Sequence, residues 1–305
     1  MAGRYYLGID GGTESVRVGV FDGAGRPVAF AAEPYQTTFQ QPGWAEQDPD
    51  AWWRALCAAV PKALASAGVS AGEIAALAAD TTSCTVVALD AAYRPLRPAI
   101  LWMDVRASRQ AEQILASGHR ALRVNGGGRG PLSAEWFLPK VRWVKENQPE
   151  LYDRATIFCE YQDYLNYRLT GRMVASLNNA SIRWHYDAED GGFREDFMTA
   201  VGLGDLPAKL PDEVLAPSTV VGGLAPVAAE AFGLPIGLPV AQGGADALIA
   251  MVGLGVVRPG SLAFVTGSSH LHLGLTATRF HTPGLWGTYA DAVIPGLGVL
   301  EGGQT

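Results

Sequence analysis

The chain has 305 residues, of which 48% are hydrophobic and 17% charged, and its formal net charge is −7. This length allows a sizeable core and favours more than one domain. The acidic balance and the lack of any Lys/Arg run argue against a nucleic-acid partner, because an acidic surface repels a phosphate backbone.

The start of the chain is predicted to be a three-stranded meander followed by a helix. The stretches YYLGI, VRVGVFD and PVAFAAE are separated by the turns DGGT and DGAGR, a pattern typical of adjacent antiparallel strands. Asp48 is then a good N-cap, Pro49 suits the first helical position and Gly68 is a C-terminal stop. Pro61 is expected to kink or split this helix. EIAALAADTT and CTVVALD predict a strand, a polar turn and a further strand.

The middle of the chain is predicted to be mainly helical. Helices are expected over residues 104–120, across most of 133–155, and over 160–171, where Gly171 closes the last one. The stretch 206–239 is rich in Pro and Gly and is predicted to be a connecting region.

The later part of the chain repeats the layout of its beginning. PVAQGGADALIAMVGLGV predicts a strand, a glycine turn and a helix, and GSLAFVTGSSHLHLGL predicts a strand, a turn and a strand. The second stretch and YLGIDGGTESVRVGV share an apolar strand, a tip of Gly with Thr or Ser, and another strand. This likeness suggests a weak internal duplication, in which two related lobes would bring both tips to one cleft.

The first tip has the composition of a phosphate site. Consecutive N–H groups of a Gly-rich turn form an anion nest, and Thr13 and Ser15 add hydroxyl donors. Asp10 would repel phosphate directly, but a carboxylate suits magnesium or its waters, with the metal bridging to phosphate. The structural alternative is a tight hairpin in which Asp10 caps its own turn. Because the chain contains neither G-x-x-x-x-G-K-[ST] nor a usable G-x-G-x-x-G, a nucleotide would have to bind through the hairpin.

The stretch QGGADA offers a second carboxylate. Phosphoryl transfer to an alcohol needs a base within reach of the hydroxyl, and Asp246 follows two glycines at a predicted helix start. The structural alternative is an N-terminal helix cap.

Taken in order, IDGGTESVRVGVFD, GGADA and TGSS resemble the FGGY family of carbohydrate kinases, within the actin-like ATPase superfamily. GWAEQDPDAWW and KVRWVKEN extend the resemblance. Within the family the chain is most similar to the ribulokinase branch, through DTTSCTVVALD, LWMDVRAS, LSAEWFLPKVRWV, IRWHYD and EGGQ. The resemblance implies an α/β, actin-like (ribonuclease H-like) fold, with a mixed sheet flanked by helices, and ATP and Mg²⁺ as cofactors.

The resemblance also implies roles for individual residues. Asp10 and Asp246 would lie near Mg²⁺, and Asp246 would take the proton from the sugar hydroxyl. Two loops and a nearby arginine would contact the ATP phosphates: Gly11, Gly12, Thr13, Ser15, Arg17, Thr266, Gly267, Ser268 and Ser269. The sugar pocket would comprise Ser83, Cys84, Asp104, Arg183, Asp246 and Glu301.

The domain organisation follows from the same resemblance. Residues 1–240 would form the N-terminal sugar-binding and phosphate-loop domain, and 241–305 the start of the C-terminal ATP-binding domain. Family members are substantially longer, and their later glycine-rich adenosine segment has no counterpart before Thr305, so the second lobe is expected to be incomplete.

The resulting hypothesis is ATP-dependent phosphorylation of a ketopentose, ribulose being favoured, at a terminal hydroxyl. Ser83 and Cys84 stand where the glycerol-kinase branch carries an Arg-Glu pair, which argues against glycerol. Arg183 stands where ribulokinases carry Lys, and a forked guanidinium is not a neutral exchange. Xylulose, erythritol and ribitol therefore stay open as substrates.

Two further hypotheses assign the chain to other classes of protein. One is a sugar-binding or regulatory remnant without turnover. The other, an ATPase that moves a partner as actin-like chaperones do, would not explain the pocket motifs. No apolar run of membrane-spanning length and no signal peptide is apparent, and three widely separated cysteines suggest reduced thiols, so a cytoplasmic location is expected. The sequence is compatible with a homodimer.

Overall fold

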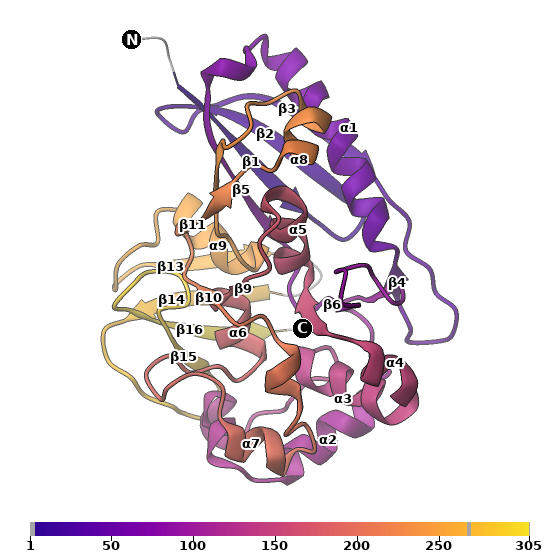
Figure 1. Cartoon of the computed structure of the whole chain (residues 1–305). Helices are drawn as coiled ribbons and strands as arrows, with labels where there is room; N and C mark the ends of the chain where they lie inside the picture. The colour runs from indigo at the N-terminus through magenta and orange to yellow at the C-terminus, as the bar shows by residue number, and fades with distance from the viewer. Residues whose placement is uncertain (1–3, 267–269, 305) are drawn as a thin grey trace.

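In the computed structural model, which describes residues 4–266 and 270–304, the N-terminal strands belong to one mixed sheet of six strands (Figure 1). Its order is β11-β12-β5-β1-β2-β3. The strands are β1 (Tyr5–Gly11), β2 (Ser15–Asp22), β3 (Pro27–Pro34), β5 (Ile74–Thr81), β11 (Val220–Gly223) and β12 (Pro239–Ala241). β1, β2 and β3 form the predicted antiparallel meander, and β5 pairs parallel to β1. The mixed sheet of the expected fold is therefore present.

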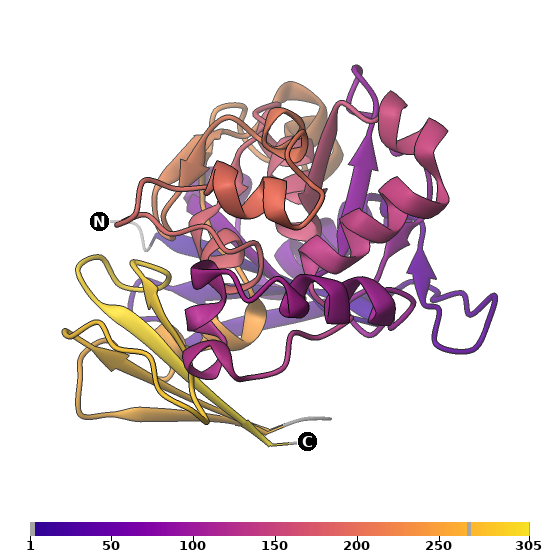
Figure 2. The ribbon, with the colours of Figure 1, turned by 90° about the horizontal axis from the view of Figure 1, so that it is seen from below.

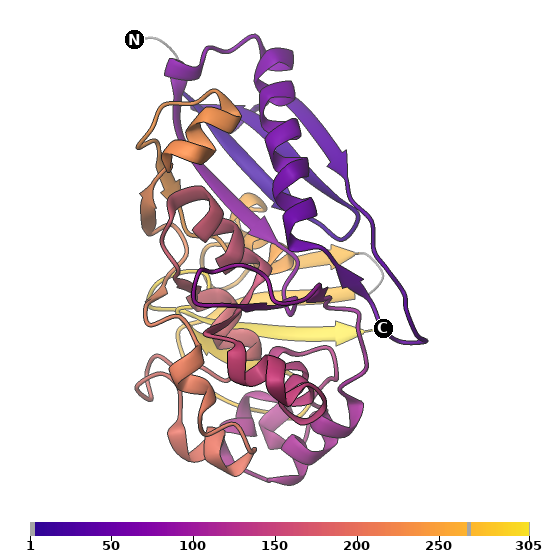
Figure 3. The same cartoon turned by 45° about the vertical axis from the view of Figure 1, so that its right-hand side comes forward.

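Three helices cover one face of this sheet: α1 (Pro49–Ala67), α5 (Tyr161–Thr170) and α8 (Pro226–Phe232). In Figure 3 α1 lies across the strands, and Leu7, Ile9 and Val18 are buried in the core beneath the helices. α1 begins as predicted, because the Asp48 side chain accepts a hydrogen bond from the Asp50 N–H. It continues unbroken through Pro61, so the predicted split is wrong.

A second core lies below the sheet in Figure 1. Its strands are β4 (Glu46–Gln47), β7 (Ala99–Ile100), β6 (Val86–Leu89) and β8 (Ile157–Glu160), in that order, with the separate pair β9 (Ala175–Ser176) and β10 (Val214–Leu215). Its helices are α2 (Ser108–Ala116), α3 (Phe137–Asn147), α4 (Pro149–Arg154), α6 (Leu177–Arg183) and α7 (Glu195–Ala200). The 3₁₀ turns of the chain are η1 (Ala71–Glu73), η2 (Arg120–Val124), η3 (Gly126–Gly128) and η4 (Leu206–Lys209).

Within the described residues, no helix is both long and apolar enough to cross a membrane.

The third core joins α9 (Asp246–Gly253) to a four-stranded sheet. Its strands run in the order β13 (Leu262–Thr266), β14 (His270–Thr276), β16 (Gly298–Gln304), β15 (Trp286–Ala290). Figure 2 shows these yellow strands as a layer at one side of the molecule. The predicted strand pairs β13–β14 and β1–β2 are both antiparallel, but residues 267–269 lie outside the described part of the chain, so the meeting of the two tips stays a prediction.

Two predicted boundaries are wrong. The stretch 206–239 is not a mere connection, because β11 and β12 extend the main sheet and Phe232 of α8 is buried in its core. Its glycines instead mark turns, as Gly233 and Gly237 adopt left-handed backbone angles. The helix expected over 104–120 spans only α2, since the Asp104 carboxylate accepts from the Arg106 N–H and stabilises a turn before it.

The turn that precedes α9 approaches β5 more closely than a side chain would allow. The Thr81 N–H donates to the Gly244 carbonyl oxygen at 3.1 Å. A Cβ added to Gly243 would stand 1.8 Å from the Ala79 carbonyl oxygen, and one on Gly244 would stand 2.6 Å from the Cβ of Asn178. These glycines therefore let the start of α9 reach the C-terminal end of β5.

Gly243→Ala is expected to lower the free energy of unfolding by roughly 3 kcal/mol or more, because backbone atoms must separate to admit the methyl group. Chemical denaturation of wild type and variant measures this change. The control is Gly253→Ala, where a Cβ would meet nothing within 4 Å. Alanine there should be neutral or stabilising by up to about 1 kcal/mol. Equal stabilities for the two variants would contradict the close approach.

Candidate active site

Three aspartates meet at one edge of the six-stranded sheet. Asp10 lies near the end of β1, and Asp80 is its direct neighbour in the parallel register with β5. Asp246 is the first residue of α9, which the glycine turn brings to the same edge through a bridge between Thr81 and Ala245. The structure thus brings together the two predicted carboxylates, and it adds Asp80.

The carboxylates affect one another's protonation. Burial raises the pKa of Asp10, and the ion pair of Arg17 with Asp10, at 2.6 Å, opposes that rise. Burial raises the pKa of Asp246 as well, and the charge of Asp10 adds to the effect. For Asp80, burial and then the charges of Asp10 and Asp246 raise the pKa to about 8. At neutral pH Asp80 therefore holds a proton that a bound cation would displace.

Neither a hairpin cap at Asp10 nor a helix N-cap at Asp246 accounts for these aspartates. The first hairpin is closed by the Gly12 N–H donating to the Ser15 carbonyl, not by Asp10. Asp10 Oδ1 is buried and has no hydrogen-bond partner among the described residues. Asp246 follows the N-cap residue Ala245, and within the described residues its Oδ1 accepts only from the adjacent Ala247 N–H at 2.7 Å. Both carboxylates therefore keep capacity for a ligand.

Side chains from other segments hold the tip of the first hairpin through hydrogen bonds. Gln47 donates to the Thr13 carbonyl oxygen at 2.6 Å, and the indole N–H of Trp102 donates to the Thr13 hydroxyl at 3.0 Å. A Cβ on Gly11 would stand 2.8 Å from the Tyr161 ring, so this position has no room for a side chain. The Thr13 hydroxyl keeps its own proton available for donation. In the second tip, Thr266 is exposed, and Gly267, Ser268 and Ser269 lie outside the described residues.

A cleft of about 560 Å³ opens on the sheet face opposite α1. Asp10, Arg17 and Asp80 line its polar part, and Phe21, Phe30, Ile249 and Val252 line its apolar part. The cleft thus combines two of the three aspartates, Asp10 and Asp80, with an apolar surface.

Arg183 and Glu301 form a second group. Arg183 ends α6, and its Nη2 lies 2.7 Å and 3.0 Å from the two carboxylate oxygens of Glu301 in β16. Its guanidinium also donates to the Tyr289 hydroxyl at 3.2 Å and lies over the Trp136 ring, 4.8 Å from the ring centre. The pair is nearly buried, so these two predicted sugar contacts are held together by a strong, well-oriented interaction.

Cys84 lies beside this group in a left-handed backbone conformation, with φ of 62°. Its N–H donates to Glu160 at 2.7 Å, and its carbonyl accepts from Lys140 at 3.0 Å. Burial raises the pKa of the Cys84 thiol to about 12, so the thiol is neutral and suits a pocket wall better than a nucleophile. The neighbouring Ser83 is half-buried.

Asp104 does not join the predicted sugar contacts in this structure. It is fully buried, and its carboxylate accepts from the Ala45 N–H and from three N–H groups of Arg106. Arg106 in turn lies over Trp44 and pairs with Glu46 at 2.8 Å. With its acceptor capacity used, Asp104 supports the wall behind the site.

Helix α6 connects the two groups. Near its start, Asn178 Oδ1 accepts from the Ala245 N–H at 2.9 Å, which fixes the residue before Asp246. At its end, Arg183 holds Glu301. Five residues of helix separate these anchors by about 7.5 Å along the axis. One short helix therefore sets the spacing between the acidic cluster and the Arg183–Glu301 pair.

The sequence interpretation missed two carboxylates. Asp80 ends an apolar strand just as Asp10 does, so the parallel between LGID and LAAD was a usable signal. Glu160 is fully buried and accepts from Cys84 N–H, the Asn179 amide and the Trp184 indole. No local pattern marks it, because its three donors come from distant parts of the chain.

The carboxylate oxygens of the acidic cluster are the type of ligand that a magnesium ion prefers. Mg²⁺ prefers oxygen ligands and is often bound by one or two carboxylates together with waters and substrate phosphates. The unpartnered Oδ1 of Asp10 is such a ligand. Within the described residues, no group of three or more His, Cys, Asp or Glu side chains is arranged to hold a metal by itself. The site therefore fits an ion that a bound phosphate helps to hold.

Comparisons with known proteins place the fold and the family. The mixed sheet and its helices are those of the actin-like ATPase fold, as in a solved xylulose kinase from Rhodospirillum rubrum, which superposes with a TM-score of 0.88 at 26% identity. The family model for the N-terminal domain of the FGGY family of carbohydrate kinases matches residues 5–253. The chain therefore belongs to the FGGY family of carbohydrate kinases, as the sequence resemblance predicted.

Named relatives are about one-third identical to this chain over the region that aligns. An FGGY carbohydrate kinase domain-containing protein from Homo sapiens is 34% identical over 99% of this chain and 59% of its own length. A ribulokinase from Geobacillus thermodenitrificans is 31% identical over 100% of this chain and 59% of its own length. This chain covers 61% of the length of the solved Rhodospirillum rubrum protein. The chain thus spans about three-fifths of the length of these proteins.

The pKa of Asp80 predicts a pH dependence of stability in metal-free buffer. Its folded pKa of about 8 lies above the ordinary value of 3.8, so the folded state binds the extra proton between these values. The contribution of Asp80 to stability should therefore fall as pH rises from about 4 to about 8. Asp80→Asn should unfold like wild type near pH 4 and be more stable near pH 8, by at least about 2 kcal/mol.

Denaturant titrations at a series of pH values check this expectation. The matched control is Asp212→Asn, because Asp212 is exposed and should leave the profile unchanged. Parallel profiles for wild type and Asp80→Asn would show that Asp80 is not part of a coupled cluster.

Proposed function

We propose that this chain carries the sugar-phosphorylating site of an ATP-dependent kinase for a ketopentose, with ribulose as the favoured substrate. The observation that carries the proposal is the position of Asp246, beside Asp10 and Asp80 and one short helix away from the Arg183–Glu301 pair. Relatives named ribulokinase and solved structures named xylulose kinase support a pentulose as the substrate class.

The reaction would be an in-line transfer. The terminal hydroxyl oxygen of the sugar attacks the γ-phosphorus of ATP, the bond to the β,γ-bridging oxygen breaks, and ADP leaves. The hydroxyl proton passes to the Asp246 carboxylate. Burial raises the pKa of Asp246, which makes it a stronger base than an exposed aspartate. The single hydrogen bond to its Oδ1 leaves the other oxygen available for this proton.

The two hairpins would hold the phosphates. In the first, Tyr161 and Arg17 leave little room for side chains at Gly11 and Gly12, and the hydroxyls of Thr13 and Ser15 would add donors. Thr266, Gly267, Ser268 and Ser269 would supply the second phosphate loop. Mg²⁺, when bound near Asp10 and Asp246, would neutralise charge that develops on the phosphoryl oxygens.

The sugar would lie between the base and the Arg183–Glu301 pair. Arg183 would donate to sugar oxygens and Glu301 would accept from hydroxyls, while Ser83 and Cys84 form a small wall. The forked guanidinium is already oriented by Glu301 and Trp136, so it would discriminate substrates by where it places its remaining donors. This arrangement keeps ribulose favoured and xylulose as the second candidate.

We also propose that residues 1–240 and 241–305 belong to different domains. The separate core of α9 and the β13–β16 sheet supports a boundary near residue 240, whereas the family model continues to residue 253, at the end of α9. A cytoplasmic location and a homodimer remain predictions.

Asp246→Asn is expected to lower the rate of sugar-dependent ADP release by roughly 10²–10⁴-fold, because the amide cannot take the hydroxyl proton. Ribulose binding, measured as heat of titration, should stay within a few-fold of wild type. Asp212→Asn, an exposed aspartate away from the site, is the control and should keep full activity.

The assay compares ribulose, xylulose, ribitol and erythritol with Mg-ATP, using the 305-residue chain and the full product of its gene. If Asp246→Asn keeps a rate within a few-fold of wild type, the base assignment is wrong. Sugar binding without turnover by either protein would favour a binding role over a kinase.

A further inference from the structure

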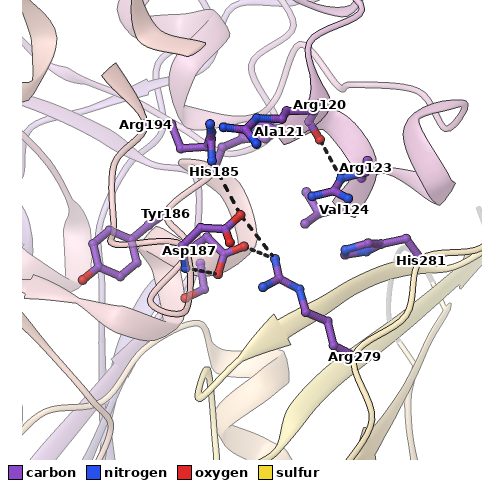
Figure 4. A pocket seen from close by; sticks show the side chains of 12 residues that line it. Arg120, Ala121, Arg123, Val124, His185, Tyr186, Asp187, Arg194, Arg279 and His281 are labelled. Atoms are coloured by element: carbon purple, nitrogen blue, oxygen red, sulfur yellow. Dashed lines mark hydrogen bonds and ion pairs between the residues drawn. The ribbon is translucent and has the colours of Figure 1, made fainter. Parts of the chain in front are cut away.

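A small pocket lies beside the Arg183 end of the proposed sugar site, where three segments meet (Figure 4). They are the η2 turn, the stretch 181–194 that follows from α6, and residues 279–281 between β14 and β15. Its inner cavity measures about 20 Å³, which is room for about one water-sized atom. It shares no lining residue with the acidic cleft or the predicted sugar contacts.

Buried polar atoms in this pocket have no partner among the described residues. They are the Ser181 hydroxyl, both ring nitrogens of His185 and the Nε of Arg194. Ser181 and His185 are only 4% and 5% exposed. Leaving such groups unpaired is costly, so their convergence on one cavity indicates a bound hydrogen-bonding group.

The unpartnered atoms of this pocket include three hydrogen-bond donors. Burial, with the nearby charge of Arg183, lowers the pKa of His185 to about 3, so its ring is neutral and offers one N–H donor. The Arg194 Nε–H and the Ser181 O–H are further donors. These groups favour an oxygen acceptor in the cavity.

The rim of the pocket is rich in arginine. Arg120, Arg123, Arg194 and Arg279 line it, against the acids Asp187 and Asp190. Arg279 already pairs with Asp187 and Glu189, and Arg194 with Asp190 and Asp196. Arg123 is exposed, and its only hydrogen bond within the described residues goes to the Arg120 carbonyl at 3.2 Å. One guanidinium at the mouth is thus left without a carboxylate partner in the described chain.

We propose that this pocket binds a compact oxyanion, namely a phosphate group. One oxygen enters the cavity and accepts from Ser181, His185 and Arg194, and the remaining oxygens lie at the mouth beside Arg123. A bound phosphate group connects the β14–β15 segment to the helical layer, because the lining residues come from both. Binding therefore stabilises this junction at a distance from the proposed catalytic carboxylates.

The test is calorimetric titration of the 305-residue chain with inorganic phosphate at constant ionic strength. Saturable binding is expected, and Arg123→Gln should weaken it by about tenfold or more, since a charge-assisted hydrogen bond is lost. Ser181→Ala should also weaken it, without lowering the unfolding midpoint in phosphate-free buffer, because it removes a hydroxyl that has no partner there. The control Arg129→Gln alters an exposed arginine nearby and should stay within about twofold of wild type.

A fourth variant separates this pocket from the proposed ATP-phosphate site. Arg17→Gln should leave phosphate binding at this pocket unchanged. If wild type shows no saturable binding, or if Arg17→Gln abolishes binding while Arg123→Gln and Ser181→Ala do not, the proposal is wrong. A water molecule would then satisfy the buried groups.

The source of the phosphate group is tested by parallel titrations with inorganic phosphate, ribose 5-phosphate and unphosphorylated ribose. Tighter binding of ribose 5-phosphate, lost in Arg123→Gln, assigns the site to a phosphate monoester. Equal or tighter binding of inorganic phosphate assigns it to the free ion. Ribose binding of the same strength as ribose 5-phosphate would contradict an oxyanion site.

Discussion

The close approach of the glycine turn to β5 is the constraint on which the proposed site depends. Because Gly243 and Gly244 lack side chains, the backbone before α9 can pair with the end of β5 and place Asp246 beside Asp80 and Asp10. The resulting cluster carries charges that repel one another, and the fold must hold them together by packing elsewhere. A bound cation would relieve that repulsion, which is consistent with the proposed metal.

Buried polar side chains supply much of that support. Glu160 joins Cys84 of the pocket wall to Asn179 and Trp184 of the α6 region, and Asp104 holds Arg106 against Trp44. Such groups are expensive to bury but, once fully hydrogen-bonded, they specify one arrangement of the chain. Here Glu160 helps to orient α6, whose two ends position the acidic cluster and the Arg183–Glu301 pair. The geometry of the proposed sugar site is therefore set by residues that need not touch a sugar.

Local patterns predicted the parts of the fold that short-range chemistry decides. The meander, the start of α1 at Asp48 and the strand-turn-helix around Asp246 were visible because turns and caps are encoded by adjacent residues. The placing of β11 and β12 in the main sheet was missed, since Pro and Gly obscure short strands whose partner lies far away in sequence. Asp10, Asp246, Arg183 and Glu301 were predicted through motifs, whereas Asp80 and Glu160 are defined by tertiary contacts. Asp104 illustrates the converse, because a residue at a motif position lies fully buried and hydrogen-bonded to Arg106, which only tertiary contacts show.

The central claim is that Asp246 and the Arg183–Glu301 pair hold opposite ends of one sugar. A crystal structure of the chain with ribulose and a non-hydrolysable ATP analogue tests it most directly. The account predicts a terminal hydroxyl about 2.6–3.2 Å from the Asp246 carboxylate, with oxygens at the other end of the sugar bound by Arg183 and Glu301. A sugar bound elsewhere, or one whose hydroxyls do not face Asp246, would contradict the account.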